Sequence, residues 1–480
     1  MPPSIAEGPV PAPIAEPVRR RPPTWLAGLL LVLGALALFA LSNPVHHNVY
    51  NHFVWQADAF LHGRAWIPYP VYPGDPMPEN WYLQDVYPLI GAEGAFDGRA
   101  LLPFPPLPAV VLLPFVALWG LTTDQEAVAL ALGAAGVGFA WWMLGGLHLR
   151  TTVRALAVGV MATGTAWWWA VAVGSTWYLA HLVATDLALL AVGVALRHDP
   201  AAAVPEPIRL GRLRAAAWPL DRWQVLAGFL LGLAVTARLP LILAAPFLLL
   251  VGGGGAPLRR LVSAGVGGVG PVAVLLAYTF LTTGSLIHPG YDYQYRLEVA
   301  GYPALGYNAA WSVEDPRYIP HNLGIMFGTY PAVAPDVLPN TLGIYEDVRA
   351  CGQPDARRSL FDKDCPLAVP IDLGTSLPLS APGLFLALLA FRSRGRSRLA
   401  IGAALAVVMI ATFNLAHFSQ GWVQWGYRFS LDFLPFLLPL VSLGAARQGD
   451  GRPRLLAFVL LVAGALVNLW GVTWGQILAW

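Results

Sequence analysis

Two carboxylates and one histidine in the segment after the first apolar run have the chemistry of acid–base catalysts. Asp58 lies in a predicted amphipathic helix, and Asp85 ends the sequence Trp-Tyr-Leu-Gln-Asp. A carboxylate within hydrogen-bonding reach of a hydroxyl can act as a general base. Asp58 is the first candidate, Asp85 the second, and His52 remains a third. The structural alternatives are a cap or an ion pair with Arg64 for Asp58, and a solvated loop carboxylate for Asp85.

Two arginines are suited to binding a phosphate group. Arg238 lies in Thr-Ala-Arg-Leu-Pro between two short apolar runs, and Arg428 lies four residues before Asp432 in a segment rich in aromatic residues. The planar guanidinium group presents a rigid fork of donors that matches phosphate oxygens. The alternatives are that Arg238 reaches toward lipid headgroups and that Arg428 pairs with Asp432 at helical spacing.

A set of polar and aromatic side chains could bind a sugar or an acceptor, because such side chains offer flat faces and hydrogen-bonding edges. Trp177, together with Tyr178 and His181, could line the cavity in which the two arginines bind phosphate. An aromatic belt at the membrane surface accounts equally well for Trp177 and Tyr178. The candidates for sugar or acceptor binding are Asn51, Tyr178, His181, Tyr291, Asp292 and His321.

Histidines 46, 47, 52 and 62 have the composition of a metal cluster, but their spacing matches no recognised zinc signature. We predict no metal site, and no cofactor is required, although a divalent metal is compatible with the chemistry. The sequence contains no nucleotide-binding P-loop, no dinucleotide-binding glycine motif beside a strand and no nucleophile elbow.

The composition is that of a membrane protein. Of the 480 residues, 56% are hydrophobic and 12% are charged, and the apolar runs approach the length that crosses about 30 Å of hydrocarbon. We predict an all-α integral membrane protein with about 11 transmembrane helices. The predicted spans are 25–42, 127–147, 155–174, 177–196, 223–238, 239–252, 262–283, 375–391, 399–415, 427–446 and 454–478.

The arginines predict the orientation of the chain in the membrane. They concentrate in short connections at 19–21, 150–154, 197–222, 259–260, 392–398 and 447–454. Positive charge favours the cytoplasmic side, so we expect a cytoplasmic N-terminus. This pattern explains the basic loops without nucleic acid as a partner.

Two long segments, 43–126 and 284–372, hold most of the carboxylates and are predicted to be extracytoplasmic loops. The apolar run 101–120 opens with four prolines. If it crossed the membrane, every later basic loop would lie outside, so we expect an interfacial or re-entrant helix. Residues 1–24 are expected to form a disordered cytoplasmic tail, and residues 373–480 to form the C-terminal transmembrane helices.

The two cysteines, Cys351 and Cys365, lie in the second outer loop, where an oxidising compartment permits a disulfide. A bridge between them would close a loop of about 14 residues and would stabilise the protein by roughly 3 kcal/mol through the loss of loop entropy in the unfolded chain. We predict that the bridge forms.

The arrangement resembles the GT-C glycosyltransferases, a superfamily of membrane enzymes that use polyprenyl-phosphate-linked sugars and include protein O-mannosyltransferases and lipid A aminoarabinose transferases. The resemblance lies in the first span, a long outer loop with an acidic residue (Asp58), a proline-led helix (Phe104-Pro-Pro-Leu107) and an outer arginine before proline (Arg238-Leu-Pro240). Many members place an acidic residue directly after the first span, where this chain has Val49-Tyr-Asn-His52.

The resemblance implies a GT-C-like bundle, with a transmembrane module over residues 25–283. It also implies transfer of a sugar from a polyprenyl-phosphate donor to a hydroxyl on a lipid, glycan or protein, outside the cytoplasm and at the bacterial inner membrane. The alternatives are a glycan polymerase or ligase that uses a diphosphate-linked donor, and a lipid or solute transporter. A transporter would predict internal repeats and ionisable residues at mid-membrane; Asp186 is the one clear mid-span carboxylate.

Overall fold

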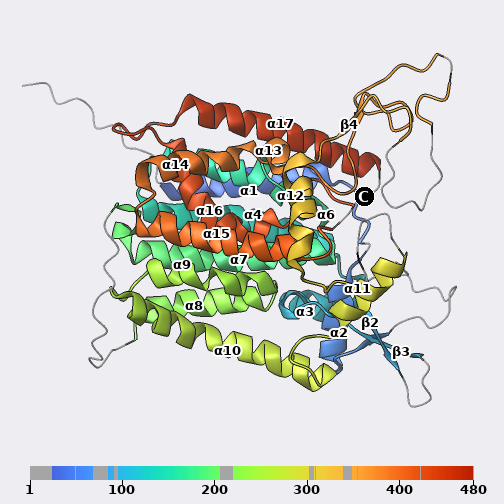
Figure 1. Ribbon diagram of the computed structural model, residues 1–480, viewed down its shortest axis with the longest axis horizontal. Helices are drawn as coiled ribbons and strands as arrows, with labels where there is room; N and C mark the ends of the chain where they lie inside the picture. Colours follow the sequence, from blue (N-terminus) through green and yellow to red (C-terminus); the bar gives the residue numbers. More distant parts are fainter. Residues whose placement is uncertain are drawn as a thin grey trace, which may run out of the picture.

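The structure is a computed structural model. It describes residues 24–48, 50–68, 85–90, 96–205, 220–301, 308, 310–338, 349–353, 355–421, 423–478 and 480. The predicted N-terminal tail falls almost entirely outside these residues, as do the residues 81–84 that precede Asp85. The described chain is mainly α-helical, and most of its helices lie side by side in one bundle (Figure 1).

Six helices are long and apolar enough to cross a membrane. They are α1 (Thr24–Ser42), α4 (Gln125–Leu144), α7 (Thr176–Arg197), α10 (Pro257–Thr283), α15 (Arg398–Ala416) and α17 (Leu455–Ile477). A seventh span results if α5 (Thr151–Thr163) and α6 (Trp167–Val173), which are bent by 49° at their junction, are taken as one. The chain is therefore a multi-pass membrane protein with an all-α transmembrane part, as predicted.

The prediction of about 11 spans was wrong for the part of the chain that the structure describes. Several of the expected spans are short helices, and α8, for example, has 14 residues, which rise only about 21 Å. Proline interrupts most of the others, because it lacks the N–H that an α-helix needs in its interior. These shorter elements are α8 (Arg222–Val235), the 3₁₀-helix η4 (Leu239–Ala244), α9 (Ala245–Leu250), α13 (Leu377–Ser380), η7 (Pro382–Phe385), α14 (Leu386–Arg394) and α16 (Ser430–Ala445).

Helices α7 and α16 form the centre of the bundle. Nearly all side chains of both helices are buried, and α7 packs against α4, α8 and α16. Helix α16 contains Pro435 and Pro439. A short helix with internal prolines is tolerated here because the surrounding helices shield it from lipid.

Glycines allow α8 and α10 to pack closely. A Cβ atom at Gly228 would lie 2.0 Å from the carbonyl oxygen of Ala264, and one at Gly267 would lie 1.9 Å from that of Val225. Small residues at a helix contact let the two backbones approach, which is a common packing mode inside membranes. The carboxyl end of α8, which leads to Arg238, is therefore held firmly against α10.

Most of the arginine-bearing connections meet at one end of the bundle. Arg260 and Arg398 both pair with Asp199, and Arg197 donates to the carbonyl oxygen of Trp142 at the end of α4. The gathering agrees with the clustering seen in the sequence. That this end faces the cytoplasm stays a prediction, and residues 206–219 lie outside the described part.

The opposite end carries the two long polar segments, which are not simple loops. The first contains α2 (His52–Leu61), α3 (Leu107–Trp119) and an antiparallel sheet of order β1-β3-β2, from Ile67–Pro68, Phe96–Leu101 and Tyr87–Ile90. The second contains α11 (Gly290–Gly301), α12 (Ile319–Gly328) and the pair β4 (Ala332–Val333) and β5 (Ala368–Val369). Figure 1 shows α2, α3, α11 and β2–β3 together at the right-hand end.

Two predictions about these segments can be compared with the structure. The disulfide between Cys351 and Cys365 is confirmed. Within the apolar run 101–120, residues Leu107–Trp119 form the 13-residue helix α3. Pro108, Ala109, Leu112 and Val116 are buried, whereas Leu118 and Trp119 are exposed. The length of α3, about 20 Å, falls short of a full crossing. The proposed division of the chain into domains stays a prediction.

Candidate functional site

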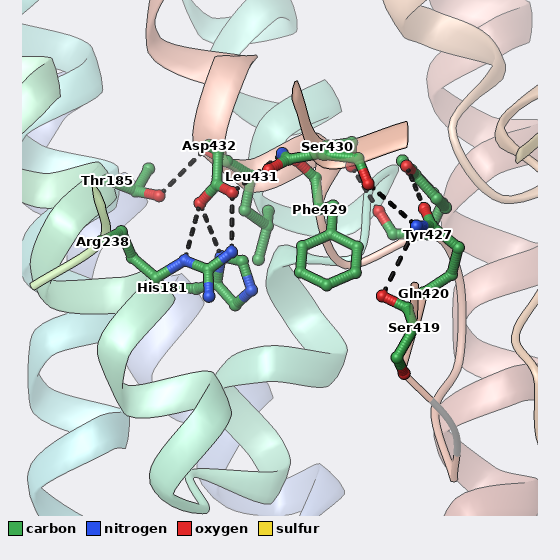
Figure 2. A network of polar contacts seen from close by, with 11 residues as sticks. His181, Thr185, Arg238, Ser419, Gln420, Tyr427, Phe429, Ser430, Leu431 and Asp432 are labelled. Carbon is green, nitrogen blue, oxygen red and sulfur yellow. Dashed lines mark hydrogen bonds and ion pairs between the residues drawn. The ribbon is translucent and has the colours of Figure 1, made fainter. Parts of the chain in front are cut away.

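A buried carboxylate organises the polar end of the bundle. Asp432, in the first turn of α16, is 1% exposed and accepts hydrogen bonds from three neighbouring segments (Figure 2). His181 Nδ1 on α7 donates to Oδ1 at 2.9 Å, and Asn414 Nδ2 on α15 donates to Oδ2 at 3.0 Å. Arg238, just before η4, contacts both oxygens. A buried charge is stable only when it is paired and hydrogen-bonded in this way.

The sequence alternative that paired Arg428 with Asp432 is wrong. Helix α16 begins at Ser430, so Arg428 lies before the helix and the four-residue spacing does not bring the two side chains together. Asp432 instead binds Arg238, and its described partners leave it fully coordinated. Arg428 is therefore available for another partner.

Both candidate arginines lie against the same aromatic ring. The guanidinium carbons of Arg238 and Arg428 are each 5.3 Å from the ring centroid of Phe429, so the two groups are separated by at most twice that distance. Arg428 also lies 5.7 Å from the ring centroid of Tyr178. Its Nε is buried and has no hydrogen-bond partner in the described part of the chain. Two cations this close to each other attract an anion.

Asp85 is the candidate base that lies with the arginines. Trp177 Nε1, in the first turn of α7, donates to Asp85 Oδ2 at 2.8 Å. Burial raises the pKa of Asp85, although the hydrogen bond from Trp177 and the positive charge of Arg428 oppose this rise. The positive charge of Arg428 therefore favours the ionised form of this carboxylate.

Tyr291 of α11 joins the same group. Burial raises the pKa of its phenol to about 12, with Arg238 lowering it and with Glu314 and Asp85 raising it. Its hydroxyl is therefore a neutral hydrogen-bonding group near both the carboxylate and an arginine. Helix α11 thus brings a side chain from the second polar segment to residues from the first segment and from the bundle.

Asp58, the first candidate base in the sequence, lies in a different environment. Its carboxylate is 3.6 Å from Arg64 Nη2 and 3.5 Å from His62 Nδ1. Among the described residues, no hydrogen bond or ion pair joins it to Arg238 or Arg428. These contacts are the ones that the ion-pair alternative anticipated.

Residues 51 and 52 support the structure around the site. His52 is fully buried, and its Nδ1 lies 3.0 Å from Thr176 Oγ1. The amide oxygen of Asn51 accepts a hydrogen bond from Trp55 Nε1 at 3.2 Å. Both side chains are committed to contacts within the protein.

The other sugar-binding candidates are divided between the site and the surface. Tyr178 and His181 lie at the site, and the Tyr178 hydroxyl donates to the carbonyl oxygen of Val423 at 3.3 Å. Asp292 is exposed and pairs with Arg296 at 2.8 Å, and His321 is exposed on α12. Of the candidates in the second polar segment, Tyr291 is the one whose pKa is influenced by Arg238 and Asp85.

Sequence reasoning missed the roles of Asn414 and Phe429. Asn414 is a polar residue within the apolar run of α15, which is a signal that could have identified it, because an amide inside a membrane helix needs a partner. Phe429 gave no signal, since an aromatic residue near a membrane surface is ordinary.

No group of three or more His, Cys, Asp or Glu side chains in the described part of the chain is arranged to hold a metal ion, and the expectation about metals stays a prediction. No protein-family model matches the sequence, and no curated protein or solved structure is significantly similar to it. The resemblance to the GT-C glycosyltransferases therefore rests on the residues quoted above.

Proposed function

We propose that this protein is a membrane glycosyltransferase that moves a sugar from a polyprenyl-phosphate donor to a hydroxyl acceptor. The observation that carries the proposal is the convergence of Arg238 and Arg428 on the Phe429 ring, with Asp85 in the field of Arg428. This group offers an anion site and a candidate base side by side. The proposal places it on the extracytoplasmic side of a bacterial inner membrane.

The two arginines would bind the donor phosphate with different roles. Arg238 is held by Asp432, so its position is fixed and part of its charge is balanced. Arg428 has no carboxylate bonded to it among the described residues and has a buried donor without a partner. We therefore assign the main phosphate contact to Arg428, with Arg238 as the second point of the clamp.

Asp85 would accept the proton of the acceptor hydroxyl. The hydroxyl oxygen then forms a bond to the anomeric carbon of the sugar, while the bond from that carbon to the phosphate oxygen breaks. The leaving polyprenyl phosphate gains one negative charge, which the arginines stabilise where it develops. A direct displacement of this kind inverts the anomeric centre, and it needs no metal because the arginines carry the phosphate charge.

The test is transfer by the purified protein in lipid nanodiscs from a panel of radiolabelled polyprenyl-phosphate sugars. Asp85→Asn should abolish transfer and keep donor binding, whereas the matched control Asp58→Asn should retain transfer, because Asp58 is paired with Arg64. A diphosphate-linked donor in the same panel distinguishes a polymerase or ligase. Full transfer by Asp85→Asn would remove that carboxylate from the mechanism, and no transfer from any donor would end the proposal.

A further inference from the structure

Trp177 has a position that an ordinary membrane-surface tryptophan does not need. Its indole N–H donates to Asp85 Oδ2 at 2.8 Å, which joins the first turn of α7 to a residue from a separate segment of the chain. Among the described residues, Trp177 is the one hydrogen-bond partner of the Asp85 side chain. Among the described residues no hydrogen bond occupies its Oδ1, the oxygen that would accept a proton.

The indole ring is itself held in place by aromatic neighbours. The Tyr50 ring lies 5.0 Å from the Trp177 ring at an angle of 57°, and the His52 ring lies 5.9 Å away, edge to face. Thr176 anchors both neighbours, since its backbone N–H donates to the Tyr50 carbonyl oxygen at 2.9 Å and its hydroxyl contacts His52 Nδ1. Packing against Tyr50 and His52 therefore restricts the orientation of the indole ring.

The backbone of Asp85 also has an unusual conformation. Its φ is +58°, in the left-handed region that residues with a Cβ atom adopt at a cost. Such a conformation persists when the surrounding contacts hold it and is often found where a side chain must be aimed. The hydrogen bond from Trp177 is a contact of this kind.

We infer that Trp177 is a positioning residue that holds the Asp85 carboxylate with one oxygen bonded and the other directed to the acceptor hydroxyl. The inference rests on the proposed function for the role of Asp85 as a base. Indole is a hydrogen-bond donor only and does not ionise at ordinary pH, so Trp177 can orient the carboxylate without competing for the proton. His52, a candidate base from the sequence, becomes part of the support of this residue.

The hydrogen bond has a second effect that makes the inference measurable. The N–H of Trp177 favours the ionised form of Asp85, as does Arg428, against the effect of burial. Removing the N–H should therefore raise the pKa of Asp85 further, by about one unit for the loss of a hydrogen bond to a charged group. Loss of a ring contact around Trp177 would act on Asp85 only by weakening this hydrogen bond, and therefore less than removal of the N–H itself.

The experiment follows the protonation of Asp85 in the full-length protein by carbodiimide modification across a pH series, with peptide mass spectrometry. Trp177→Phe keeps a ring and removes the N–H, and should move the midpoint for Asp85 up by about one pH unit. Trp168→Phe is the control, because Trp168 also loses a buried indole hydrogen bond, to Ser42, and should leave the midpoint unchanged. A midpoint unaltered in Trp177→Phe, or moved equally in Trp168→Phe, would overturn the inference.

Transfer kinetics supply the second readout. Trp177→Phe should lower kcat by about tenfold with little change in the donor KM. The acidic limb of its profile of kcat against pH should move to higher pH. If Trp177→Phe does not fold, Tyr50→Leu loosens the ring without removing the N–H and should move the Asp85 midpoint in the same direction by less. The modification assay does not depend on sugar transfer. If the wild-type protein has no transferase activity, the proposed function is wrong, but the modification midpoints of Asp85 still show whether the hydrogen bond from Trp177 acts on it.

Discussion

Arg238 and Asp432 lie 194 residues apart in the sequence and form a two-point ion pair, in which Nε and Nη2 donate to the two carboxylate oxygens at 3.2 and 2.8 Å. The pair joins the segment after α8 to the start of α16. His181 and Asn414 complete the coordination of the carboxylate. This pair fixes one half of the proposed anion site before any ligand binds.

The first prediction concerns stability. Asp432→Ala should lower the free energy of unfolding by about 2–4 kcal/mol, because the partly buried Arg238 would lose its counter-charge and the buried His181 and Asn414 a hydrogen-bond acceptor. Thermal unfolding in detergent, followed by circular dichroism, measures the change. Asp450→Ala is the control, since Asp450 forms a weak exposed contact with Arg452 and its loss should have no measurable effect. Equal melting temperatures for the two variants would contradict the assignment.

The second prediction concerns the donor phosphate. Arg428→Ala should raise the donor KM by about 10- to 100-fold, because a hydrogen bond to a charged group is lost, and Arg428→Lys should recover only part of the loss because lysine lacks the fork. The wild-type KM should rise with salt concentration. Arg317→Ala is the control, as Arg317 is bonded to Asp315. An unchanged KM in Arg428→Ala would remove Arg428 from the phosphate site.

The third prediction is a dependence on pH. Asp85 must be deprotonated to act as a base, and burial raises its pKa above the ordinary value of 3.8. The carboxyl therefore becomes protonated at a higher pH than an exposed aspartate, and kcat/KM should fall as the pH decreases through that raised pKa. Profiles measured for wild type and Asp58→Asn should have the same acidic limb. A limb that disappears in Asp58→Asn would instead make Asp58 the base.

The fourth prediction concerns Asp186 in the middle of α7. It is 4% exposed, and neither carboxylate oxygen has a hydrogen-bond partner among the described residues. Asp186→Leu has a similar size and removes both oxygens that lack a partner, so it should stabilise the protein by about 1–3 kcal/mol. Thermal unfolding measures the gain, and transfer should be unaffected. A loss of stability would reveal a partner for Asp186, and a loss of function would favour the transporter alternative.

The fifth prediction concerns sidedness. The two cysteines of the chain are joined in the disulfide, so an introduced cysteine is the one free thiol. A membrane-impermeant maleimide should label His321→Cys on α12 in intact cells, and Asp450→Cys at the arginine-rich end only after the membrane is opened. The reverse pattern would place the candidate site in the cytoplasm, where polyprenyl-phosphate sugars would have to be presented on the other leaflet.

The sequence determined the features that depend on local composition. Apolar runs such as α1 and α17 identified full-length spans, because their length alone meets the thickness of the hydrocarbon. The cysteine pair was predicted from its position in a polar segment, and the arginine clusters anticipated one basic end of the bundle. Each of these properties is carried by residues close together in the chain.

The number of spans depended on packing that the sequence does not carry. Apolar residues in α8 and α16 satisfy a hydropathy pattern equally whether they face lipid or protein. Other helices surround α16 in the structure, and this shielding from lipid allows it to be short and to contain two prolines. Burial by neighbours, rather than apolar length, decides what such a segment can be.

The choice among candidate site residues was also made by the tertiary structure. The sequence ranked Asp58 above Asp85 as the base, and Arg428 is spaced from Asp432 as a helical pair would be. Only the packing of α16 against η4 and α7 brings Asp432 to Arg238 and His181, and Arg428 acts instead on the charge of Asp85. The free energy of a charge depends on which groups surround it in space, and those groups come from segments hundreds of residues apart.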